Sequence, residues 1–160
     1  MASDYLLEID GIKGESKDKK HPGTIEISSF SWGCSNAGSM ASGSGGGAGK
    51  ASFSDLSFMG STASQSPLLV LACATGQHIK SAKLFVRKQG SEQHDFYVIT
   101  LSDILVSSFQ HSGSDGSGQV PSESFSLNFS KIEFSYSPQK ADGSLDTAIK
   151  ASWNLKENVK

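Results

Sequence analysis

Residues 43–50 read GSGGGAGK and are the first candidate for chemistry. A glycine-rich turn that ends in lysine can cradle the phosphates of a nucleotide. The spacing departs from that motif, because Ser44 stands where the first glycine is required and Ala51 where a magnesium-binding Ser or Thr is required. Alternating residues follow, so no helix N-terminus is available for a pyrophosphate. The segment is predicted to be a connector, and no nucleotide is expected.

The remaining chemical groups are scattered. Asp95 directly follows His94, and neighbours on a strand point to opposite faces, which suits an acid–base pair poorly. Serine is abundant, but no G-x-S-x-G elbow occurs. The other titratable candidates show no metal-ligand spacing: His21, His78, His111, Cys34 and Cys73. We therefore expect no catalytic residue, no metal, no cofactor and two free thiols.

Composition restricts the class of protein further. The 160 residues suffice for one domain, expected to span residues 1–160, and the net charge is −2. That charge is too small to hold nucleic acid or an anionic membrane. The N-terminus has acids where a signal peptide needs an apolar stretch, and the apolar run 68–74 is too short to cross a bilayer. We expect synthesis in the cytoplasm and no membrane insertion.

Period-two alternation predicts that strands form most of the chain. The apolar face changes phase between Ile27 and Phe30, between Phe53 and Leu56, and again after Phe129, and such slips are typical of β-bulges. Ser66, Pro67 and Gly76 are suited to the N-cap, first turn and C-terminal end of a short helix over about 66–76. The predicted fold class is mainly β: a compact barrel of two curved antiparallel sheets with one short flanking helix.

Two of the predicted strands have an aromatic face and a face of small polar residues. Ser and Asn alternate with Phe over 124–130, and Ser31 lies between Phe30 and Trp32. A solvated face usually carries Lys and Glu, so this pattern favours either a subunit contact or the wall of a wide channel. Charged residues are only 19% of the chain, which also suggests a surface that meets another protein.

Motifs along the whole chain closely resemble the haemolysin-coregulated proteins of type VI secretion systems. The segments that carry the resemblance are IKGESKDKKH at 12–21, SFSWG at 29–33, GKA at 49–51, ACATG at 72–76, AKLFVRK at 82–88, SFSLNFS at 124–130 and PQKADG at 138–143, with Trp153. The resemblance implies a β-barrel subunit that assembles as a hexameric ring, and rings that stack into the inner tube of a contractile injection machine. Its implied partners are further copies of itself, a valine–glycine-repeat spike, a contractile sheath and small effector proteins. It also implies secretion to the medium or into target cells.

Two surfaces are the candidate sites for such assembly. Ser31 is expected to line the lumen, because Phe30 and Trp32 take the core face of its strand. The long Gly/Ser-rich loop 35–50 is expected to govern contacts between subunits or between rings. Its candidate contact residues are Ser42, Gly43, Ser44, Gly45, Gly46, Gly47, Ala48, Gly49 and Lys50. Two alternatives remain open: a monomeric, lectin-like β-sandwich module, and a secreted effector with unrecognised activity.

Overall fold

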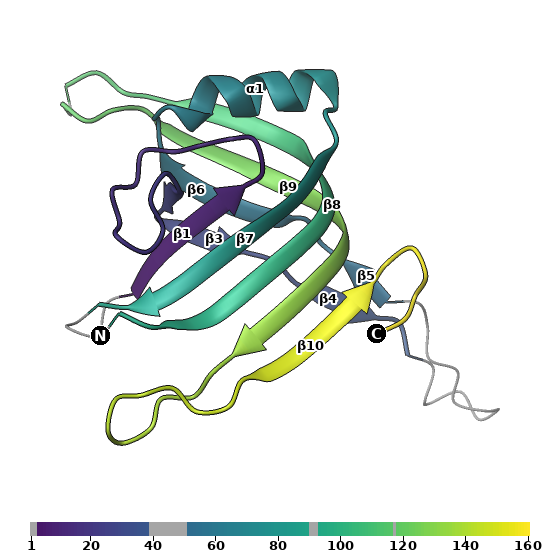
Figure 1. Cartoon of the computed structure of the whole chain (residues 1–160). Helices are drawn as coiled ribbons and strands as arrows, with labels where there is room; N and C mark the ends of the chain where they lie inside the picture. Colours follow the sequence, from purple (N-terminus) through teal and green to yellow (C-terminus); the bar gives the residue numbers. More distant parts are fainter. Residues whose placement is uncertain (1–2, 39–50, 90–92, 117) are drawn as a thin grey trace.

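Strands dominate the computed structural model of the chain, which describes residues 3–38, 51–89, 93–116 and 118–160. In chain order the elements are β1 (Ser3–Ile9), β2 (Ile25–Ile27), β3 (Ser29–Ser31), β4 (Cys34–Asn36), β5 (Ala51–Phe53), β6 (Leu56–Ser61), α1 (Gln65–Thr75), β7 (Ile79–Lys88), β8 (Asp95–Ser112), β9 (Ser122–Tyr136) and β10 (Ile149–Asn154). The prediction of a mainly β barrel with one helix is confirmed (Figure 1).

A single eight-stranded antiparallel sheet curls round to form the barrel. The strands follow the order β2-β1-β7-β8-β9-β6-β3, and β10 pairs with β9 off that path. The two ends of this order, β2 and β3, are consecutive in the chain and are separated only by Ser28. Ser28 donates its backbone N–H to the carbonyl of Met59 at 2.8 Å, so the kinked segment 25–31 closes the barrel. The predicted phase slip between Ile27 and Phe30 marks this closure.

A second slip bends the two longest strands together. On β9 the inward-facing residues pass from Phe129 to Ile132, a step of three that reverses the alternation. On β8 they pass likewise from Leu101 to Ile104, which pairs with Phe129. Asp103 lies between them on β8 with a positive φ of 51°, unusual for a residue other than glycine. The Ser130 hydroxyl donates to the Ser102 carbonyl at 3.2 Å and to Asp103 Oδ2 at 3.1 Å. These bonds hold the bend that wraps both strands around one core.

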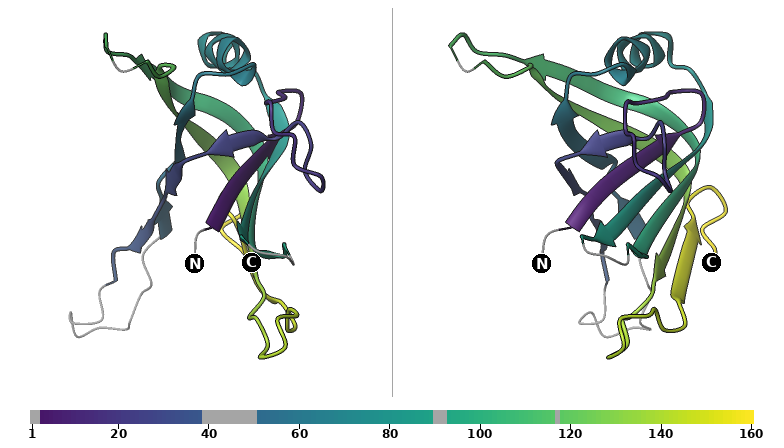
Figure 2. Two further views of the ribbon diagram at one scale, coloured as in Figure 1. Left: turned by 90° about the vertical axis from the view of Figure 1, so that its left-hand side faces the viewer. Right: turned by 60° about the vertical axis from the view of Figure 1, so that its left-hand side comes forward.

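The helix covers one end of the barrel. Leu69 and Ala72 of α1 are completely buried against the core, whereas the termini lie away from the helix (Figure 2). Gly76 ends the helix with φ +63°, where its N–H bonds to the Cys73 carbonyl at 3.4 Å. The predicted stop is confirmed.

Three sequence predictions need correction. The N-cap is Ser64 rather than Ser66, because the Ser66 hydroxyl lies inside the protein on Glu123. The barrel is one continuous sheet instead of two, and among the described residues β4 and β5 form a separate two-stranded ribbon. The loop predicted over 35–50 begins later, because Ser35 and Asn36 belong to β4.

Candidate assembly surfaces

One outer side of the barrel is almost free of charge. We call it the serine face, and it comprises Ser29, Ser31, Ser57, Met59, Ser108, Gln110, Ser124 and Ser126 on β3, β6, β8 and β9. These residues border a shallow groove of about 300 Å³. Phe30 packs inward opposite Phe58, so Ser31 points outward and is exposed, as the sequence predicts. The structure thus brings Ser31 together with serines that lie far away in the sequence.

Hydrogen bonds hold this surface in place beside a bulge in β8, where the register of β8 on β9 shifts. Asp55 accepts from the Ser107 hydroxyl at 2.6 Å and from Asn128 Nδ2 at 2.9 Å. Ser126 in turn shares hydrogen bonds with Ser107 at 2.7 Å and with Ser108 at 2.5 Å. One carboxylate thus anchors a connected chain of hydroxyls, and this network fixes the orientation of the serine side chains in it.

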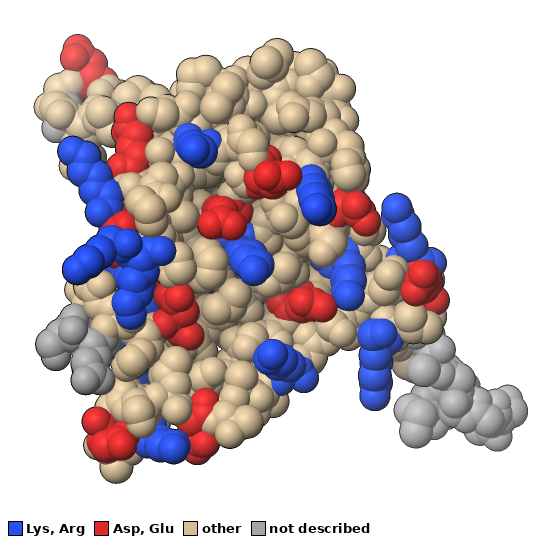
Figure 3. Space-filling view, viewed as in Figure 1, with Lys and Arg blue, Asp and Glu red and all other residues tan. Residues whose placement is uncertain are grey.

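The face formed by β1, β7, β8 and β9 has the opposite character. Glu8 on β1 pairs with Lys83 on β7. Lys83 in turn pairs with Thr100 on β8, and Thr100 pairs with Glu133 on β9. Lys131 Nζ lies 3.3 Å from Glu133 Oε1. Figure 3 shows Lys and Asp or Glu side chains interspersed over this side. We call it the charged face, and its mixed signs are typical of a surface in contact with water.

Ion pairs and a ring stack hold the segment 13–23 against the sheet. This segment carries the KGESKDKKH motif. Arg87 is 4% exposed and forms an ion pair with Asp18, and this contact lowers the pKa of Asp18 to about 2 and raises that of Arg87. The His21 ring stacks on Phe85 with centroids 4.0 Å apart, and its Nε2 lies 2.8 Å from Asp95 Oδ2. Asp95 therefore pairs with His21, a long-range contact that alternation could not indicate.

A buried carboxylate joins the helix to the sheet. The Glu123 side chain on β9 is fully buried, and it accepts from Gln65 Nε2 at 2.6 Å and from the Ser66 hydroxyl. His111 Nε2 lies 3.8 Å from Glu123 and 3.0 Å from the Thr62 hydroxyl. A nucleophilic triad needs the hydroxyl and the carboxylate on different ring nitrogens, whereas here both face Nε2. This cluster is therefore suited to anchoring and not to catalysis.

The other serine, histidine and carboxylate cluster has the wrong order for hydrolysis. Asp103 accepts from Ser130 and lies 3.2 Å from His78 Nε2, so the carboxylate and not the imidazole is in the middle. The Ser130 hydrogen bond, followed by His78, lowers the pKa of Asp103. Among the described residues no group of three or more His, Cys, Asp or Glu side chains could hold a metal ion.

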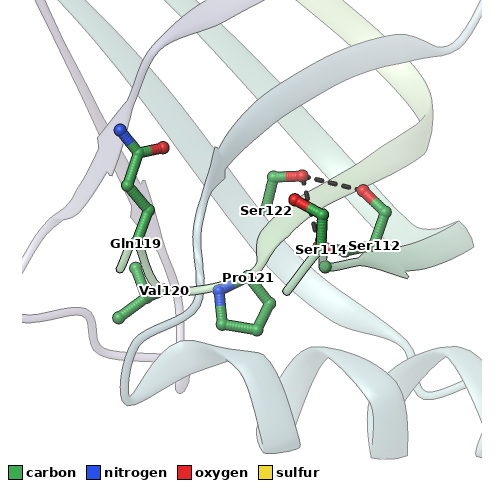
Figure 4. Close-up of a pocket in the computed structure, with 7 residues that line it drawn as sticks. Ser112, Ser114, Gln119, Val120, Pro121 and Ser122 are labelled. Atoms are coloured by element: carbon green, nitrogen blue, oxygen red, sulfur yellow. Dashed lines mark hydrogen bonds between the residues drawn. The ribbon is translucent and has the colours of Figure 1, made fainter. Parts of the chain in front are cut away.

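A pocket of about 290 Å³ lies in the loop that joins β8 to β9, at the adjoining ends of the two strands (Figure 4). Its residues are Ser112, Gly113, Ser114, Gln119, Val120, Pro121 and Ser122. The hydroxyls of Ser112 and Ser122 lie 2.8 Å apart across it. None of these side chains titrates near neutral pH, so the pocket offers no acid or base to a substrate.

The remaining predicted features fall partly outside the described structure. Cys34 is exposed on β4 and Cys73 is half-buried on α1, and both are free thiols. The candidate loop residues 42–50 lie outside the described residues. Within the described part of the chain, no helix has the length and apolar character needed to cross a bilayer.

The barrel thus presents an ordered hydroxyl surface, a separate charged surface and a helix that covers one end. Distinct surfaces of this kind are suited to contacts with other subunits. The chain matches the family described as "Type VI secretion system effector, Hcp" over residues 6–136. It is 44% identical to protein Hcp1 of Pseudomonas aeruginosa over 161 aligned residues, which cover 99% of each chain. The chain belongs to the Hcp family of type VI secretion tube proteins.

Solved structures agree with this assignment. A structure of a type six secretion system protein superimposes with a TM-score of 0.93 at 31% identity, covering 98% of each chain. Hcp1 from Salmonella typhimurium superimposes with a TM-score of 0.81 at 34% identity, covering 99% of each chain. The barrel, the helix and their order are thus those of the family.

Proposed function

We propose that six copies of this protein close into a ring with the serine face toward the lumen, and that rings stack into the tube of a type VI secretion system. The observation that carries the proposal is the contrast between the uncharged, hydrogen-bonded serine face and the charged face of the same barrel. A neutral wall of hydroxyls lets polar cargo pass without binding it tightly, while the charged face remains toward the outside. The mechanism is mechanical, with weak contacts summed over the ring and the stack.

The proposal includes the partners that the family resemblance implies. These are small effector proteins in the lumen, a valine–glycine-repeat spike at the tip and a contractile sheath around the tube. Contraction of that sheath would expel the tube into the medium or into a target cell. No enzymatic step is required.

Solution mass tests ring formation. Light scattering after size exclusion should give about six times the 16.9 kDa chain mass, and negative-stain images should show rings with a central hole. A monomer would overturn the ring and favour the alternative of a monomeric binding module. A hydrolase screen of the ring addresses the alternative of an effector with its own activity.

A substitution at Ser31 tests the orientation of the serine face. Ser31→Gln should leave the ring mass unchanged and weaken the retention of a co-expressed effector, because a longer amide disrupts the hydroxyl wall. The matched control is Lys83→Gln on the charged face, which should retain the effector normally. If Lys83→Gln weakens retention and Ser31→Gln does not, the orientation of the subunit is reversed.

The Gly-rich loop is proposed to govern stacking rather than ring closure. Its residues 42–49 carry no charge and almost no side chain, and glycines allow close backbone approach to a partner. Replacing Gly45, Gly46 and Gly47 with Asp should leave ring mass and melting temperature unchanged and abolish both tube formation and secretion. Mutant rings that still stack and are secreted would assign the loop no role in stacking.

A further inference from the structure

A short segment on the outer side of β7 is held in place with little help from apolar side chains. We call residues 17–22 the latch, and their sequence is KDKKHP. Backbone hydrogen bonds close its base, from the Gly23 N–H to the Ser16 carbonyl at 2.8 Å and from the Ser16 N–H to the Thr24 carbonyl at 3.0 Å. Pro22 is exposed. Burial of apolar surface therefore contributes little to keeping the latch closed.

Polar contacts fasten the latch beyond its base. Among the described residues, three of its side chains make such contacts with the rest of the chain. Asp18 forms the ion pair with Arg87, and Lys20 Nζ donates to the backbone carbonyl of Gln93. His21 makes the ring stack and the 2.8 Å contact with a carboxylate described above. The closed position thus depends on a few separate attachments.

Buried polar atoms under the latch lack hydrogen-bond partners. Within the described part of the chain, Arg87 Nε, Arg87 Nη1 and Asp95 Oδ1 are buried and unpaired. Arg87 Nε lies 3.8 Å from Asp4 Oδ2, which is longer than a hydrogen bond. A buried polar atom without a partner costs free energy that contact with water would return. Opening of the latch would let water reach these atoms, so it recovers part of the cost of closure.

The latch is also loosely packed against the sheet. A pocket of about 480 Å³ is lined by Lys17 and Asp18 of the latch and by Asp4, Leu6 and Arg87 of β1 and β7. By contrast, β1 pairs with β7 over its whole length. Segments with few apolar contacts open at a lower free energy than paired strands around a core. The latch and the strands beneath it are therefore expected to differ in local stability.

We propose that the latch opens as a unit while the barrel stays folded, and that this opening exposes the Arg87 guanidinium to solvent. The closed latch covers Phe85 with the His21 ring and occupies Arg87 with the Asp18 carboxylate. Opening replaces that covered surface by an accessible cation beside a phenyl ring. The device belongs to a single copy of the chain and does not depend on ring formation.

Modification of arginine tests the opening, because Arg87 is the only arginine in the sequence. Phenylglyoxal reacts with accessible guanidinium groups, and Arg87 is 4% exposed in the closed state. Intact mass and peptide mapping should show slow addition at Arg87 while tryptophan fluorescence stays native. The rate should hardly change in low concentrations of urea, because local opening exposes little surface, whereas global unfolding responds steeply to urea.

Asp18→Asn should accelerate this reaction. The variant removes the charge and keeps the side-chain oxygen that accepts from the backbone N–H groups of Lys20 and His21. The rate should rise by roughly 10–100-fold at neutral pH, the factor that corresponds to the lowered pKa of Asp18. Asp142→Asn is the matched control, because Asp142 is an exposed carboxylate that accepts from the N–H and hydroxyl of Ser144 in its own turn. It should leave the rate unchanged.

The outcomes separate a local opening from unfolding of the barrel. A modification rate that follows the urea dependence of global unfolding would overturn the latch, because Arg87 would then become accessible only with the whole barrel. Equal rates in Asp18→Asn and the natural protein, or equal acceleration in Asp142→Asn, would show that the Asp18 ion pair does not hold the latch closed. Each result is independent of the mass of the assembly, so the proposed ring is tested separately.

Discussion

Arg87 shows what a single side chain does for this protein. It is buried under the segment 13–23, and its ion pair with Asp18 fastens that segment to β7. Removing only one partner of such a pair leaves a buried charge without compensation. The contact therefore makes the stability of the protein dependent on the charge of Asp18.

Acid should remove this contribution. The pKa of Asp18 is about 2 in the folded protein against 3.8 in an unfolded chain, so ionised Asp18 contributes about 2 kcal/mol above pH 4. That stability is lost as the pH falls through the range from about 4 to about 2. Asp18→Asn should lower the free energy of unfolding in urea by about this amount at neutral pH. The difference from the natural protein should nearly vanish near pH 2, and an equal difference at both pH values would contradict the assignment.

Gly14 is a second residue whose identity the fold restricts. A Cβ there would lie 2.5 Å from the Thr24 carbonyl oxygen and 2.7 Å from Ile25 Cα, closer than side-chain atoms approach backbone. Gly14→Ala should therefore lower the free energy of unfolding by about 1–3 kcal/mol. Gly33→Ala is the matched control, because a Cβ at Gly33 meets nothing within 4 Å and the melting temperature should hardly change. Equal melting temperatures for the two variants would contradict this reading.

At the scale of elements, α1 depends more on Glu123 than on its N-cap. The buried carboxylate accepts hydrogen bonds from Gln65 and Ser66 in the first turn, whereas Ser64 donates at the surface to Glu15 Oε1. Ser66→Ala leaves one lone pair of a buried carboxylate unpaired and should cost about 1–3 kcal/mol. Ser64→Ala should cost less, and amide exchange in α1 should accelerate only in Ser66→Ala. The reverse order would show that the helix is held by its cap.

Alternation in the sequence identified which residues face inward and where strands bend. The phase slips after Ile27 and after Phe129 correspond to the barrel closure and to the shared bend of β8 and β9. The second half of β8 was not predicted, since Asp103, Ser107 and Ser108 interrupt its alternation. Of the candidate site, the outward position of Ser31 could be predicted from its own strand. The serines around it could not, because strand pairing depends on contacts between residues far apart in the chain.

At the scale of the whole molecule, the barrel has differently built surfaces on its sides and at its ends. Charges occupy one side and hydroxyls another, and exposed aliphatic side chains of α1 occupy one end. Salt screens exposed charges and does not weaken apolar contacts. If rings close through apolar surfaces, their mass at low protein concentration should be the same in dilute buffer and in about 1 M salt. Dissociation by salt would point to closure through the charged face.

The segment 25–31 has one consequence for how the barrel resists force. In a barrel closed by pairing of its two edge strands, hydrogen bonds alone join those strands across the seam. Here the seam runs through the peptide bonds on either side of Ser28, so the circumference is closed by covalent bonds at that point. A force across the barrel at this point must first break the hydrogen bonds that pair β2 with β1 and β3 with β6. The barrel therefore keeps its cross-section under load better than a barrel whose seam is held by hydrogen bonds alone.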